Sequence, residues 1–130
     1  MAVTNVFTDT ISISYTGNGK VVSSQVGTYT GTKDAGVAAV ITAGATAQEI
    51  DVAFPFATIV AIILATDQDV TVKTNSSGSP VDTLIVKKTA GVVWANDYAT
   101  TNPITADVTK LFVANAGAVD AKFNVRVLYT

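Results

Sequence analysis

The clearest pattern in the chain is an alternation of apolar and polar residues close to its C-terminus. Apolar side chains occupy the odd positions from Val119 to Tyr129, and polar or charged side chains occupy most of the even positions between them. Only Leu128 breaks the alternation. A period of two predicts a β-strand with one buried and one solvated face.

A second alternating segment lies near the N-terminus. Ile11, Ile13 and Tyr15 alternate with serine and threonine, and the sequence GNGK (residues 17–20) follows them. Glycine and asparagine readily adopt the positive φ angles that tight hairpin turns require. We therefore expect a β-hairpin whose second strand runs from Val21 to Thr30.

The rest of the chain predicts short strands separated by turns. The segment ATIVAIILA (57–65) is almost continuously apolar, as in a central strand covered on both faces, and Pro55 interrupts the strand before it. The alanine-rich segment 34–44 contains glycine and β-branched residues, which favour a strand or an irregular connection over a helix. Further strands are predicted within residues 46–54, 69–75, 82–88, 91–96 and 107–116.

Eight or nine short strands with turns rich in Gly, Asn, Ser and Pro predict an all-β fold. We expect a single domain over residues 1–130, an antiparallel β-sandwich with the jelly roll as its leading topology. The sequence does not reveal the order of the strands in the sheets.

Composition narrows the chemistry. The chain contains neither histidine nor cysteine, which removes the usual general base, the usual zinc ligands and any disulfide. We therefore expect no enzyme, no cofactor and no metal. The net charge is -2, and the basic residues do not form a stripe along the sequence. Both observations argue against nucleic-acid binding. The longest apolar run, Ile59 to Ala65, is far shorter than the roughly 20 residues of a membrane helix.

Charged residues make up only 14% of the chain. A surface of Thr, Ser, Asn and Ala is typical of a domain that packs against other subunits, so we expect a homo-oligomer. Val3, Val6 and Phe7 lie at the N-terminus without a clean strand register. They are candidate contacts with another subunit or a capsid if residues 1–8 form an arm, and otherwise belong to the first strand of the domain.

Two pairs of carboxylates could in principle perform chemistry. Asp67 and Asp69 share a strand face, where an acid/base or calcium site is conceivable, but no calcium-loop pattern accompanies them. Glu49 and Asp51 form a similar pair that would need a third carboxylate across the sheet to resemble a glycosidase couple. We interpret both pairs as solvated strand positions.

Trp94 and Tyr98 could together form an aromatic platform for a sugar, with Asn96 and Asp97 as polar partners. The favoured interpretation is that Trp94 anchors the core at the end of a strand.

The succession TDQDVTVKTNSSGSP (66–80), VVWAND (92–97), ADVTKLFVANAG (106–117) and NVRVLYT (124–130) resembles small virion proteins encoded among the head genes of tailed phages. The likeness covers the chain from Ala43 onward. It implies a β-sandwich or jelly-roll domain that serves as a capsid decoration (cement) protein or minor head protein, often trimeric, on the surface of the capsid. The implied partners are the major capsid protein and copies of the chain itself. A tail or fibre subunit and a carbohydrate-binding module remain the alternatives.

Overall fold

The computed structural model describes residues 6–17 and 20–130, with the backbone alone described for residues 13–17 and 20–26. The described residues form ten strands and no helix, so none of them belongs to a helix that could span a membrane. The strands are β1 (Phe7–Gly17), β2 (Lys20–Gly31), β3 (Lys33–Ile41), β4 (Gln48–Ile50), β5 (Ile59–Thr66), β6 (Val70–Thr74), β7 (Thr83–Val86), β8 (Val92–Ala95), β9 (Leu111–Ala114) and β10 (Ala121–Tyr129).

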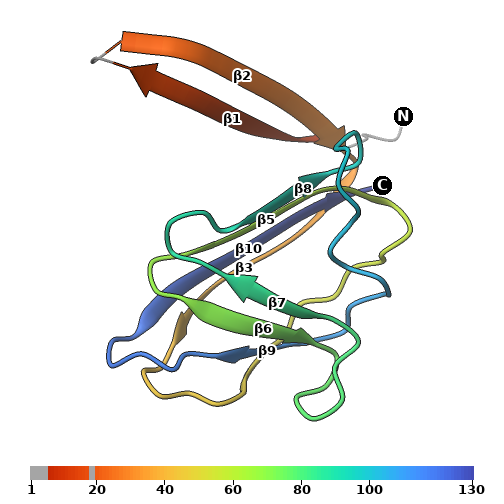
Figure 1. Cartoon of the computed structure of the whole chain (residues 1–130). Helices are drawn as coiled ribbons and strands as arrows, with labels where there is room; N and C mark the ends of the chain where they lie inside the picture. The colour runs from red at the N-terminus through yellow and green to blue at the C-terminus, as the bar shows by residue number, and fades with distance from the viewer. Residues whose placement is uncertain (1–5, 18–19) are drawn as a thin grey trace.

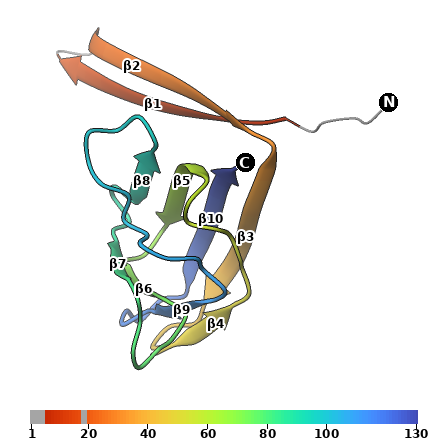
Figure 2. The same ribbon diagram turned by 90° about the vertical axis from the view of Figure 1, so that its right-hand side faces the viewer.

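Eight of these strands form two antiparallel sheets that pack face to face (Figure 2). One sheet has the order β3-β10-β5-β8, and the other has the order β4-β9-β6-β7. Successive strands from β3 to β6 alternate between the sheets, and so do β7 to β10 after the β6–β7 hairpin. This arrangement of eight strands is a jelly roll, which confirms the predicted β-sandwich.

The core lies between the two sheets. In β10, Phe123, Val125 and Val127 point inward and alternate with polar residues on the other face, as the sequence predicted. The apolar segment 57–65 provides β5, which pairs with β10 on one side and β8 on the other and contributes Ile62 and Leu64 to the core. Each large apolar side chain buried in this way stabilises the fold by about 1.5–3 kcal/mol.

The remaining pair, β1 and β2, forms an antiparallel hairpin that joins neither sheet. Its base lies at the ends of β3, β10, β5 and β8, and its tip points away from the sandwich (Figure 1). The hairpin was predicted from the alternation and the GNGK sequence, and the structure places the strand ends at Gly17 and Lys20. Residues 18 and 19 of that turn lie outside the described residues.

One loop is held from inside by Asn115, a fully buried residue that the sequence did not single out. Its Nδ2 donates to the carbonyl oxygens of Ile41 at 3.1 Å and Val119 at 2.9 Å, and its Oδ1 accepts from the amide of Gly117 at 3.1 Å. Buried amide side chains of this kind need all their partners, because a lost hydrogen bond leaves a desolvated polar atom.

Several predicted elements differ from the observed ones. The described chain has ten strands rather than eight or nine. The strand predicted within 46–54 ends at Ile50, although Val52 and Phe54 stay buried, and Phe54 forms an isolated bridge with Val108. The strand predicted within 107–116 is shortened to Leu111–Ala114.

The burial predicted from the C-terminal alternation is also wrong at two positions. Val119 was expected on the buried face, but it lies in the loop before β10 and is 60% exposed. Leu128 was expected to break the pattern on the solvated face, but it is fully buried. The base of the hairpin covers it, so the exception in the pattern marks a second packing surface.

Candidate functional site

The base of the hairpin rests on the outer face of the β3-β10-β5-β8 sheet. Ala61, Ala95 and Leu128 are fully buried there and form a small cluster that is separate from the main core. They lie side by side across β5, β8 and β10, because Leu128 pairs with Ala61 and Ala61 pairs with Ala95. The hairpin residues that pack on this cluster are Phe7, Ile11 and Tyr29. We call Ala61, Ala95, Leu128 and the adjacent Arg126 the hairpin seat.

An ion pair fastens the hairpin to the seat. Asp9 of β1 is only 5% exposed, and its Oδ1 accepts a hydrogen bond from Nε of Arg126 at 2.5 Å. Nη1 of Arg126 also donates to Oδ2 of Asp34 in β3 at 3.3 Å. The hydrogen bond and the charge of Asp9, with a smaller contribution from Asp34, raise the pKa of Arg126 despite partial burial. The guanidinium therefore stays charged and joins three strands.

The buried carboxylate of Asp9 depends on Arg126. Its second oxygen, Oδ2, is buried and has no hydrogen-bond partner among the described residues. A buried carboxylate is costly unless it is paired, so the position of the hairpin is coupled to this one guanidinium. Sequence reasoning missed both residues, since Arg126 looked like an ordinary solvated position of an alternating strand.

Close packing at the base restricts two further positions. Gly31 ends β2 beside the end of β10, and a Cβ atom there would lie 2.7 Å from the carbonyl oxygen of Tyr129. Tyr29 lies near Asp97, and burial first, followed by a hydrogen bond to Asp97, raises the pKa of its hydroxyl. Both features tie the end of β2 to the sandwich.

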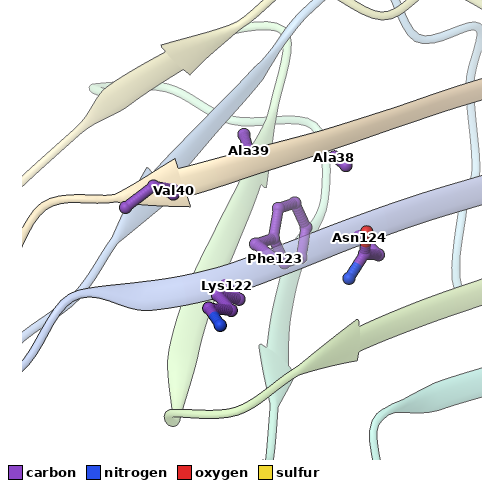
Figure 3. Close-up of a pocket in the computed structure, with 6 residues that line it drawn as sticks. All are labelled: Ala38, Ala39, Val40, Lys122, Phe123 and Asn124. Atoms are coloured by element: carbon purple, nitrogen blue, oxygen red, sulfur yellow. The ribbon is translucent and has the colours of Figure 1, made fainter.

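Beyond the seat, the same face of the sheet is uncovered. Its exposed residues include small and apolar side chains, with Val40 55% exposed and Val93 39% exposed, and also Lys122 and Asn124 of the central strand β10. Figure 3 shows one part of this surface, where Ala38 and Val40 of β3 lie beside Lys122 and Asn124 of β10 around a shallow hollow of about 260 Å³. We call the surface formed by Gly36, Ala38, Val40, Ala65 and Val93 the open face.

The carboxylates that the sequence singled out hold the backbone in place. Oδ1 of Asp67 accepts from the amide of Lys122 at 2.7 Å. Asp69 binds the amide of Lys88 at 2.9 Å and Nζ of Lys87 at 3.1 Å. Asp67 thus anchors the β5–β6 turn to β10, Asp69 anchors it to the segment that follows β7, and the two do not converge on one site.

Asp69 gives the fold a measurable dependence on acid. The amide of Lys88, and then Lys87, lower the pKa of this carboxyl below its usual value. Its contribution to stability is fully present above about pH 5 and is lost as the pH falls below about 4, through the lowered pKa. We expect Asp69→Asn to lower the thermal midpoint at pH 7 and to match the wild type near pH 2. A midpoint difference that stays constant from pH 7 to pH 2 would show that the charge of Asp69 contributes nothing.

Glu49 and Asp51 share one lysine. Nζ of Lys110 pairs with Glu49 and lies 3.9 Å from Asp51, and the hydrogen bond to Glu49 raises the pKa of Lys110. No third carboxylate joins them in the described part of the chain, which holds no cluster of acidic residues able to bind a metal ion. The two carboxylates, which were interpreted as solvated strand positions, form surface ion pairs with Lys110, and Asp51 lies just after the end of β4.

The structure does not bring Trp94 and Tyr98 onto one platform. Trp94 packs against the main core and donates from Nε1 to the carbonyl oxygen of Thr100 at 2.9 Å. Tyr98 packs instead against the outer cluster at the hairpin seat. Trp94 lines an open hollow beside Phe56, but it is partly buried and fixed as a strand anchor, as the favoured interpretation predicted.

The three candidate contact residues at the N-terminus have different environments. Val3 lies outside the described residues. Val6 is 65% exposed, whereas Phe7 begins β1 and packs on the hairpin seat. Part of the suspected arm, Phe7 and Thr8, therefore belongs to a strand.

The described residues thus provide a contact surface, made of the hairpin, its seat and the open face, rather than a constellation of reactive groups. Comparisons with protein-family models, with curated proteins and with solved structures found no match to this chain.

Proposed function

We propose that this protein is a structural subunit of a tailed-phage virion, a decoration protein that stabilises the head by bridging neighbouring capsomers. The observation that carries the proposal is the uncovered outer face of the β3-β10-β5-β8 sheet, where small and apolar side chains surround Lys122 and Asn124 beside a projecting hairpin, on a domain with few charges. The sequence resemblance to phage head proteins supports the same function, and the jelly roll is a fold that capsid proteins use widely.

The physical role would be mechanical and not chemical. Each subunit would bury small and apolar side chains of the open face against the major capsid protein, while copies of the chain contact one another. Many weak contacts repeated by the symmetry of the shell would together resist the pressure of packaged DNA. Such a protein needs no cofactor, and its carboxylates are free to serve as the loop anchors described above.

The open face suggests a direct test on shells of the same phage's major capsid protein. Purified protein should sediment with these shells and reach saturation at a fixed ratio to the capsomers. Val40→Lys should weaken this binding by about tenfold or more, because the new ammonium group would have to lose water at the contact. A lysine side chain on an exposed strand should leave the fold intact.

A matched control uses the same substitution elsewhere. Val81 is 52% exposed, close to the 55% of Val40, but it lies in the loop before β7 on the other sheet. Val81→Lys should bind as the wild type does. If the wild-type protein does not sediment with the shells, the decoration function is wrong, and equal binding by both variants would exclude the open face as the contact.

A further inference from the structure

The hairpin is joined to the sandwich by a single residue. β2 ends at Gly31 and β3 begins at Lys33, so only the exposed Thr32 lies between them. Figure 2 shows the chain turning there from the hairpin into β3. A very short connection of this kind favours exchange of the segment between copies, because the segment can leave its own domain by opening one hinge.

The contacts of the hairpin with its own sandwich are made by side chains. Among the described residues, no backbone hydrogen bond connects β1 or β2 with the eight strands of the sandwich. The contacts come from the base of the hairpin, from Phe7, Asp9, Ile11 and Tyr29. Opening the hinge would therefore disrupt no ladder of either sheet, and the same contacts can form with the seat of another copy.

The hairpin and the hairpin seat are each less stable when they are apart. A hairpin of two strands is marginally stable in water by itself, and β1 and β2 are long, with 11 and 12 residues. Lifting it would expose Leu128, which is fully buried in the seat, and would separate Arg126 from Asp9. An open hairpin therefore has a strong tendency to dock again on a seat with the same chemistry.

The short hinge favours a seat on another molecule, since short hinge loops promote exchange of a segment between copies. Gly31 fits against Tyr129 and Leu128 because it has no side chain, and a Cβ atom there would collide with both. The same close contact can form between Gly31 of one chain and the end of β10 of another. The seat itself remains complementary to the hairpin, because the structure shows the hairpin residues that fill it.

We propose that the chain exchanges its hairpin, so that the seat formed by Ala61, Ala95, Arg126 and Leu128 takes the β1–β2 hairpin of a second copy. Asp9 of one chain then pairs with Arg126 of its neighbour. This inference goes beyond the proposed function, because it requires only copies of the chain and no capsid.

Charge reversal at the ion pair tests the exchange. Asp9→Arg and Arg126→Asp each place like charges between a hairpin and a seat of the same variant. The two variants are coexpressed with different tags. Where one variant exchanges its hairpin with the other, each hairpin meets a seat of opposite charge. Native mass spectrometry should then find assemblies that contain both chains, at least about tenfold more abundant than assemblies of either variant alone. If the coexpressed pair is no more soluble or assembled than each variant alone, exchange is wrong.

A second measurement avoids any change at the seat. Inserting a flexible Gly-Ser segment of four residues after Thr32 should convert the assembled wild-type protein into monomers, because lengthening a short hinge removes its preference for exchange and leaves each hairpin on its own seat. A wild-type protein that is already monomeric, or an assembly whose mass the insertion leaves unchanged, would overturn the proposal. If the lengthened monomer binds shells, the decoration function does not require exchange. If the wild-type protein exchanges its hairpin but does not bind shells, exchange is supported and the decoration function is wrong.

Discussion

Replacing Arg126 by leucine should release the hairpin from the sandwich. Asp9 is 5% exposed, and among the described residues Arg126 is the only side-chain partner of its carboxylate, so the variant would leave a buried carboxylate without this partner. We expect the free energy that holds the hairpin on the sandwich to fall by about 2–3 kcal/mol. This loss is smaller than that for breaking a fully buried ion pair, because the Arg126 side chain is 42% exposed. Amide hydrogen exchange in β1 and β2 should accelerate by about 30-fold or more, while the amides of β10 remain protected.

The double variant Asp9→Leu/Arg126→Leu separates the lost charge from the lost packing. Removing both charges leaves no buried carboxylate, so the double variant should recover most of the protection that Arg126→Leu loses. A double variant as unprotected as the single one would contradict the role assigned to the ion pair. The loss would then have to come from the aliphatic part of Arg126.

Phe123→Ala should produce the largest loss of global stability. Phe123 is fully buried in the core cluster between the sheets, and the members of this cluster come from both layers. Truncating such a side chain removes its transfer free energy and leaves a cavity, which together cost about 3–5 kcal/mol. The midpoint of chemical denaturation should fall accordingly, and all strands of the sandwich should unfold together.

Phe56→Ala is the matched control, because Phe56 is 40% exposed and lies before β5. Its removal should change the free energy of unfolding by less than about 1 kcal/mol. Comparable losses in the two variants would mean that Phe123 does not occupy a tightly packed core.

The strands were largely predictable because burial in a sandwich imposes a period of two on the sequence. The alternation in β10 and the continuous apolar run of β5 each reflect which faces are covered. The pairing of the sheets was not predictable, since β3 lies beside β10 and β4 beside β9, far apart in the chain. The sequence within each of these strands does not show which distant strand it pairs with.

The contact surface was predictable only in part. Leu128 was recognised as an exception, but the sequence could not show that a hairpin near the opposite end of the chain covers it. Asp9 and Arg126 resembled ordinary polar positions, because a long-range ion pair has no local signature. Asp67 and Asp69 were interpreted as solvated strand positions; they are exposed but lie in the turn between β5 and β6, and their backbone partners, Lys122 and Lys88, are too distant in sequence to have been named.

The solution mass of the purified protein, measured by light scattering over a wide concentration series, tests most directly whether this is an assembling structural subunit. The chain has a mass of 13.4 kDa. We expect a stable multiple of this mass that persists on dilution, with three copies as the expected number. A mass of 13.4 kDa at every concentration would contradict it, because the hairpin would then rest on its own seat and the protein would not assemble on its own.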